Sequence, residues 1–123
     1  MAAKLSTREL CALARTAGYE VLEATQLRPN RWSLLLRNPA GTVLLVLAQA
    51  RPLITAADVQ DLADLVRLRP AVHGVLLAID GAFSPAAQRT FAELANERLH
   101  LASSLPPAAG TPLPAGAALQ TGR

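Results

Sequence analysis

The sequence predicts an α/β domain with the element order αβββαβαβ, folded as a three-layer α-β-α sandwich around a mixed sheet. Helix-type spacing of apolar residues recurs at 6–17, 56–68 and 85–97, and short runs rich in Leu and Val separate these segments. The runs at 34–36 and 43–47 do not alternate with polar residues, which is typical of strands buried on both faces. We therefore expect helices on both sides of the sheet.

The three predicted helices begin at residues that cap helix N-termini. Two pairs have the spacing of a capping box, Ser6 with Glu9 and Thr55 with Asp58. Ser84 followed by Pro85 suits an N-cap and the first helical position of the third helix. In the second helix, Asp58, Asp61 and Asp64 mark the more solvated side.

Five strands are predicted around these helices. They lie at 19–22, 31–37, 42–49, 72–79 and 99–101. The segment Asn38-Pro39-Ala40-Gly41 has turn chemistry, so the second and third of these strands are expected to pair as an antiparallel hairpin.

Composition indicates one domain at residues 3–101, followed by a tail at 102–123. The tail contains four Pro, three Gly and six Ala, so we expect it to be disordered. No apolar run approaches the roughly 18–20 residues that span a bilayer, and residues 1–9 carry charges where a signal peptide is apolar. The single cysteine, Cys11, excludes an internal disulfide. We expect a cytoplasmic protein without membrane contact.

Positive charge is concentrated in one stretch of the chain. Between Ala24 and Ala57 there is no acidic residue, and four arginines occur, Arg28, Arg31, Arg37 and Arg51. Antiparallel pairing of the hairpin should bring Arg28, Arg31 and Arg51 to one end of the sheet, with Arg37 roughly 20 Å away at the other end. Guanidinium groups bind phosphate bidentately, so Arg28, Arg31 and Arg51 are predicted DNA contacts. A solvated surface of uneven charge is the alternative interpretation.

The element order, together with short motifs at the junctions, resembles the Mrr-like branch of the restriction-endonuclease fold, the PD-(D/E)xK superfamily. Gly18-Tyr19-Glu20-Val21 follows the first helix, and Gln49-Ala50-Arg51 is similar to the family's Q-x-K or E-x-K. The segment 82–87 looks like the family's Phe-Thr-x-x-Ala loop, and Leu99-His100-Leu101 matches its closing strand. The likeness covers almost all of residues 6–101.

The resemblance implies a metal-dependent nuclease site, from which this sequence departs. In the family, an Asp on one strand and a Glu or Gln on the next hold a divalent ion, and a Lys orients the attacking water. These positions fall on Ser33, Gln49 and Arg51, which form a poor site for Mg²⁺ and include no possible base. No acid lies between Glu23 and Asp58, and Glu20 is the candidate substitute carboxylate.

Three functions remain open from the sequence. The leading one is a catalytically inactive nuclease-fold domain, without a metal cofactor, that binds the backbone of double-stranded DNA or assembles with a nucleic-acid-processing partner. The second is an active endonuclease that uses Mg²⁺ and a migrated carboxylate. The third is a protein-interaction or homodimerisation module that does not bind DNA. A carboxylate near Gln49 would favour the second, and dispersed arginines would favour the third.

Overall fold

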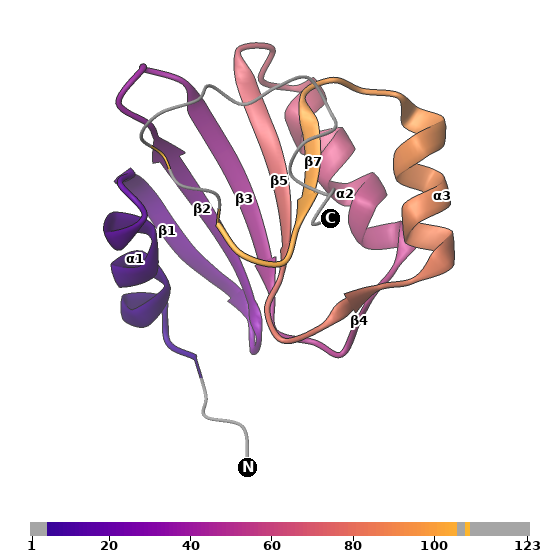
Figure 1. Cartoon of the computed structure of the whole chain (residues 1–123), viewed down its shortest axis with the longest axis horizontal. Helices are drawn as coiled ribbons and strands as arrows, with labels where there is room; N and C mark the ends of the chain where they lie inside the picture. The colour runs from indigo at the N-terminus through magenta and orange to yellow at the C-terminus, as the bar shows by residue number, and fades with distance from the viewer. Residues whose placement is uncertain (1–4, 106–107, 109–123) are drawn as a thin grey trace.

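The computed structural model describes residues 5–105 and 108, and it has the predicted mixed α/β architecture (Figure 1). The helices are α1 (Thr7–Thr16), α2 (Ala56–Arg67) and α3 (Pro85–Leu94). The strands are β1 (Glu20–Arg28), β2 (Arg31–Arg37), β3 (Val43–Gln49), β4 (Leu53–Ile54), β5 (Val72–Ala78), β6 (Ala82–Phe83) and β7 (Leu99–Ala102). The two-residue strands β4 and β6, which pair with each other in parallel, were not predicted.

The main sheet has five strands in the order β1-β2-β3-β5-β7. Strands β1, β2 and β3 are antiparallel, whereas β3, β5 and β7 run parallel because helices connect them. The carboxyl ends of β3 and β5 therefore lie side by side at one end of the sheet, where the Ile79 amide donates to the Gln49 carbonyl at 2.8 Å.

Helices cover both faces of this sheet, as predicted from its apolar strands. Leu10 and Ala14 of α1 pack against one face, in a core that includes Leu34 and Val46. The second core has the following members from α2, α3 and the strands: Leu47, Val59, Leu62, Val66, Leu76, Ala87, Leu99 and Leu101. Because side chains alternate along a strand, Val46 and Leu47 enter different cores, which explains the uninterrupted apolar run in β3.

Strand β1 is longer than the predicted strand at 19–22. It continues to Arg28 and turns back into β2 through Pro29 and Asn30, where Asn30 takes a left-handed φ of 65°. Residues 22–23 and 25–28 are exposed at this outer strand. Without a buried face they lack the apolar alternation by which a strand is recognised in sequence.

The end of the domain also differs from the prediction. Helix α3 stops at Leu94 rather than near 97, because Ala95 adopts a left-handed φ of 47°. Ala102 belongs to β7 rather than to the tail, and the Ala108 amide donates to the Ala17 carbonyl at 2.8 Å. Residues 103–105 of the predicted tail are also described, whereas 106–107 and 109–123 lie outside the described residues. None of the helices described is long and apolar enough to cross a membrane.

Candidate nucleic-acid interface

The predicted motif positions lie on the sheet face that α2 covers. Gln49, the last residue of β3, is fully buried and lies directly across from Arg31 on β2. Ser33 is half-buried and lies across from Leu47, two residues before Gln49, so its side chain is on the same face. The hairpin thus brings Arg31, Ser33 and Gln49 together at one end of the sheet.

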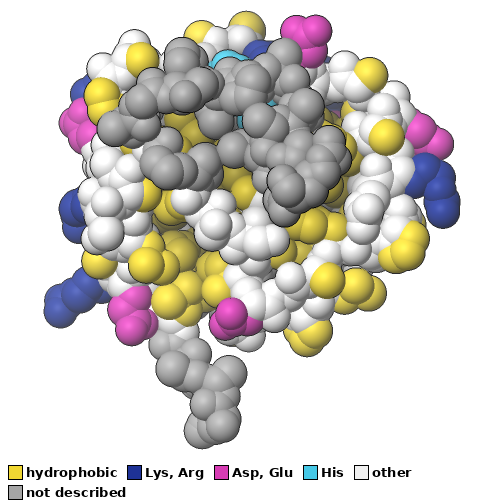
Figure 2. All heavy atoms as spheres, in the orientation of Figure 1, with side chains coloured by type: hydrophobic (Ala, Val, Ile, Leu, Met, Phe, Trp, Pro, Cys, Tyr) yellow, Lys and Arg dark blue, Asp and Glu magenta, His cyan; other side chains and the backbone are white. Residues whose placement is uncertain are grey.

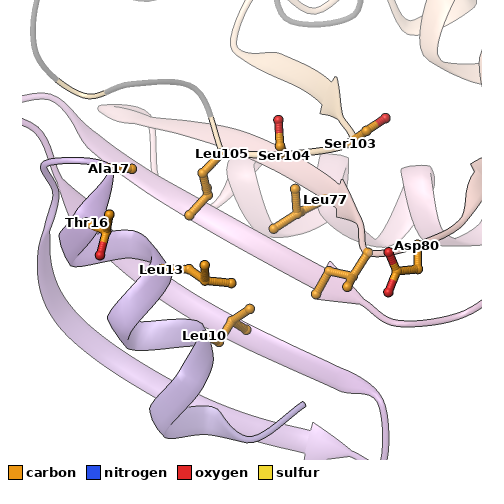
Figure 3. Close-up of a pocket in the computed structure, with 10 residues that line it drawn as sticks. Leu10, Leu13, Thr16, Ala17, Leu77, Asp80, Ser103, Ser104 and Leu105 are labelled. Atoms are coloured by element: carbon orange, nitrogen blue, oxygen red, sulfur yellow. The ribbon is translucent and has the colours of Figure 1, made fainter. Parts of the chain in front are cut away.

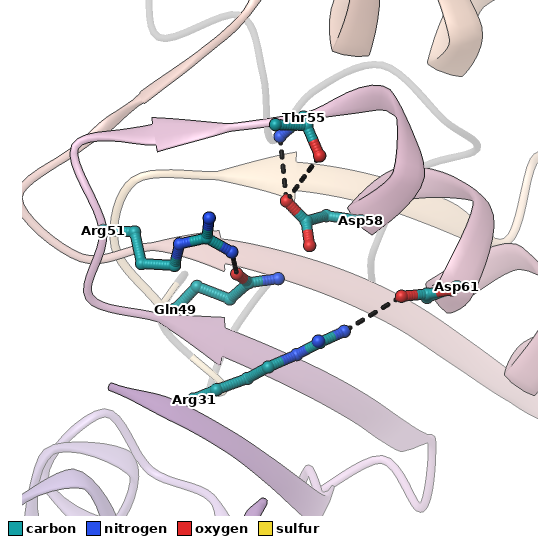
Figure 4. Close-up of polar contacts among 6 residues, drawn as sticks. All are labelled: Arg31, Gln49, Arg51, Thr55, Asp58 and Asp61. Atoms are coloured by element: carbon teal, nitrogen blue, oxygen red, sulfur yellow. Dashed lines mark hydrogen bonds and ion pairs between the residues drawn. The ribbon is translucent and has the colours of Figure 1, made fainter. Parts of the chain in front are cut away.

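A carboxylate reaches this cluster from helix α2, and it is Asp58 (Figure 4). Its side chain is 4% exposed, and its Oδ2 accepts hydrogen bonds from the Thr55 backbone amide at 2.8 Å and hydroxyl at 3.0 Å. Burial by itself raises the pKa of the Asp58 carboxyl. The Thr55 hydrogen bonds, the adjacent Gln49 amide and the charge of Arg31 outweigh burial and lower this pKa below its ordinary value. Asp58 is therefore a buried, ionised group beside Gln49.

The sequence identified Asp58 as a helix cap and placed it on the more solvated side of the helix; the second prediction is wrong for this residue, because the first turn of α2 faces the buried end of β3. The capping role is confirmed by its bonds to Thr55, but a capping box also places its carboxylate at the first turn of α2, close to the end of β3. The sequence feature that could have placed Asp58 near Gln49 is the short connection of six residues, 50–55, between the end of β3 and the helix.

The expected substitute carboxylate, Glu20, does not lie near Gln49. Glu20 is the first residue of β1 and pairs across the sheet with Arg37, at the far end of β2 from Arg31. Its Oε1 accepts from Arg37 Nη2 at 2.7 Å and Nε at 3.1 Å. Six strand steps separate this end from the Gln49 end, which is roughly 20 Å. The sequence analysis predicted a strand that ended at residue 22. Because β1 continues to Arg28, it is Arg28 and not Glu20 that lies at the Gln49 end of the sheet.

Three arginines gather at the Gln49 end, as predicted from the hairpin. Arg28 pairs with Arg31 at the β1–β2 turn, and Arg51 follows β3 by two residues. Arg51 Nη1 donates to Gln49 Oε1 at 3.4 Å, and Arg31 Nη2 contacts Asp61 Oδ2 of α2 at 3.0 Å (Figure 4). Within the part of the chain described, neither Arg28 nor Arg51 forms an ion pair.

The residues around Gln49 do not fit a divalent metal ion. They offer one amide and two carboxylates, Asp58 bonded to Thr55 and Asp61 bonded to Arg31, with two guanidinium groups beside them. Among residues 5–105 and 108, no three His, Cys, Asp or Glu side chains group to hold a metal. Two buried N–H donors here, Gln49 Nε2 and Arg31 Nε, have no hydrogen-bond partner among the described residues. Unpaired donors beside guanidinium groups suit an anion rather than a cation.

An apolar hollow lies on the opposite face of the sheet, between α1 and the end of β5 (Figure 3). It encloses about 310 Å³ and is lined mainly by apolar side chains, including Leu10, Leu13, Leu77 and Leu105, with Asp80 at its margin. Figure 2 shows hydrophobic side chains gathered on that face of the molecule. This hollow has no guanidinium group, and it is separated from Gln49 by the sheet.

Two histidines form a stacked pair on that same face. The rings of His73 and His100 are 5.6 Å apart between centroids, and His73 Nδ1 lies 3.3 Å from His100 Nε2. Burial, and then the charge of His73, lower the pKa of His100 from 6.5 to about 4, while burial and Arg98 lower that of His73. Trp32 and Cys11 are buried in the core on this face.

Comparisons with known proteins identify the fold. No family model and no curated protein matches the sequence. The structure is similar to EndoMS in apo form, with a TM-score of 0.58 and 19% identity over 86% of this chain and 48% of that one. It is also similar to EndoMS in a complex with dsDNA, with a TM-score of 0.57 and 20% identity over 87% of this chain and 47% of that one. A third similar structure is a repair endonuclease from Pyrococcus abyssi, with a TM-score of 0.51 and 15% identity over 87% of this chain and 50% of that one.

The chain has a restriction-endonuclease-like nuclease fold. It spans about half the length of the solved proteins it resembles. At these identities the likeness extends to the fold, and the chemistry has to be argued from the residues around Gln49.

Proposed function

We propose that this chain is a Mrr-like nuclease-fold domain with a degenerate catalytic motif, which binds the backbone of double-stranded DNA without cleaving it. The observation that supports this most directly is the donor set at the motif positions. Ser33, Gln49 and Arg51 stand where the family has metal ligands and a lysine, and the one carboxylate that reaches them, Asp58, is engaged by Thr55.

Hydrolysis would need a set of metal ligands or an effective general base, and the side chains of the cluster suit neither role. Arg51 stays protonated at any accessible pH and cannot take a proton from water. Asp58 has a lowered pKa and is surrounded by hydrogen-bond donors, so it is a weak base. These properties favour electrostatic binding over catalysis.

Binding to phosphate is supported by the position of the arginines. Arg28, Arg31 and Arg51 lie at one end of the sheet, which disfavours a module that does not bind DNA and for which dispersed arginines were expected. Arginine contacts to phosphate position a protein on DNA without reading its sequence. The similarity to EndoMS, whose structure is known in complex with dsDNA, supports the same ligand class.

The binding test compares two double variants that remove the same charge from opposite regions. Arg28→Ala with Arg51→Ala should lower the slope of log affinity against log salt for a short DNA duplex by about two units, independent of DNA sequence. The control, Arg37→Ala with Arg89→Ala, removes two charges away from Gln49 and should leave the slope nearly unchanged. Fluorescence anisotropy over about 50–200 mM salt measures both. Absence of binding at the lowest salt would leave a protein-interaction module as the better account.

The cleavage test uses supercoiled plasmid with Mg²⁺ or Mn²⁺. We expect no nicking. Nicking that disappears with both Gln49→Ala and Asp58→Asn would overturn the proposal and show an active endonuclease in which Asp58 is the migrated carboxylate.

A further inference from the structure

Arg31 differs from the other two arginines of the cluster because a carboxylate already neutralises it. Asp61, on α2, approaches its Nη2 to 3.0 Å. The guanidinium-bearing side chain is 21% exposed and the aspartate side chain 53% exposed, so the carboxylate lies on the solvent side of the pair. Any anion that approaches Arg31 from solvent meets Asp61 first.

The acids of α2 have different partners, and among the described residues Asp61 is the one that forms an ion pair with the sheet. Asp58 accepts from Thr55, and Asp64 accepts from Arg67 at 2.7 Å on its own helix. Asp61 is thus the acid in direct contact with the proposed DNA-binding residue Arg31.

The Arg31–Asp61 contact uses only part of the guanidinium edge. Nη2 is bonded, but the neighbouring Nε is buried and has no hydrogen-bond partner among the described residues. Arg37 shows the complete arrangement at the other end of the sheet, where both Nε and Nη2 donate to Glu20. An oxyanion that replaces the Asp61 carboxylate meets the Nη2 donor, whose bond to Asp61 is the one that can be exchanged from solvent.

We infer that Asp61 occupies the position of a DNA phosphate on Arg31 and is displaced when the backbone binds. The inference rests on the proposed function. An exposed ion pair is weak and readily exchanged, and the half-exposed aspartate can turn into solvent. A phosphate in its place accepts a charge-assisted hydrogen bond from the same Nη2 donor. Asp61 thereby weakens binding to any polyanion and sets the salt concentration at which DNA is released.

The experiment compares Asp61→Asn with Asp64→Asn, which change the net charge equally on neighbouring turns of one helix. At about 50 mM salt, Asp61→Asn should bind a DNA duplex about three- to tenfold more tightly than wild type, with a salt slope larger by about one unit. Asp64→Asn should bind less than about twofold more tightly, because it frees only Arg67. Unchanged circular dichroism confirms that both variants fold.

A second pair of variants assigns the gain to Arg31. Arg31→Ala should weaken binding little in the wild type, where Asp61 masks it, and should abolish the gain in the Asp61→Asn background. Equal gains for Asp61→Asn and Asp64→Asn, or a gain that survives Arg31→Ala, would overturn the inference. In either case a slope lowered by Arg28→Ala with Arg51→Ala would still support DNA binding, so the two failures are distinguishable.

Discussion

At the scale of single residues, the Gln49 cluster shows how a polar group is kept inside an apolar domain. Gln49 is fully buried, and its carbonyl oxygen accepts from Arg51 at 3.4 Å, while its amide nitrogen has no hydrogen-bond partner among the described residues. A buried amide without partners would cost about 1–3 kcal/mol. Arg51 therefore contributes to stability by pairing the Gln49 carbonyl oxygen, as well as to the charge pattern of the surface.

The histidine pair makes stability depend on pH. The folded protein keeps His100 neutral, with a pKa of about 4 against 6.5 for the unfolded chain. The unfolded state therefore binds more protons between these values, and stability should be complete above about pH 6.5 and fall as the pH drops toward 4, by at most roughly 3 kcal/mol. Urea unfolding at successive pH values measures this loss.

His100→Leu removes the titrating ring from the core and should flatten the stability profile between about pH 4 and 6.5. Asp58 has a lowered pKa, so its contribution is present above about pH 3.8 and is lost only below it. A His100→Leu profile as steep as that of the wild type would show that other groups cause the acid sensitivity.

At the scale of secondary structure, the packing of α2 on the sheet determines where Asp58 and Asp61 lie. Val59, Leu62 and Val66 anchor the helix over β3 and β5, and Gly74 of β5 lies directly beneath it. A Cβ atom at position 74 would clash with Val66 Cγ2 and press on Leu62. The helix can lie this close to the strand only because position 74 is glycine.

Gly74→Ala should destabilise the domain by about 1–3 kcal/mol, because the helix has to move away from β5. Val66→Ala, which removes the clashing methyl groups, should recover part of this loss when it is combined with Gly74→Ala. Urea unfolding of the two single variants and the double variant measures the coupling. Strictly additive losses would contradict the close approach.

At the scale of the whole molecule, protection from solvent decreases from the centre of the sheet to β1. Strands β3 and β5 are covered on both faces, whereas seven of the nine residues of β1 are exposed and the other two are half-buried. Strand β1 also has a neighbour on one side only. Amide exchange should therefore be slowest in β3 and β5 and clearly faster at the outward-facing amides of β1.

Hydrogen-exchange mass spectrometry or NMR tests this order. Because β1 is an edge strand, its outward amides have no partner within the sheet. Protection of β1 equal to that of β3 would contradict the prediction and would indicate that a second chain pairs with this edge. Exchange measured at two protein concentrations separates these cases.

Local sequence determined most of the elements. Ser6, Thr55 and Ser84 begin the helices at the predicted residues, since capping depends on groups three positions apart. The apolar runs of β2 and β3 identified the centre of the sheet, and their antiparallel pairing was sufficient to place Arg28, Arg31 and Arg51 at one end. These predictions depend only on interactions within a helix turn or a hairpin, which are local in sequence.

Tertiary structure alone decided which acidic residue contacts which arginine or amide. Glu20 is separated from Gln49 because β1 extends to Arg28, an exposed edge strand without an apolar pattern. Asp58 reaches Gln49, and Asp61 reaches Arg31, because α2 crosses the sheet at a position set by Gly74 and its apolar contacts. The contact between Arg31 and Asp61 joins residues 30 positions apart. Such contacts follow from how helices pack on a sheet, and neither charge nor periodicity along the chain encodes them.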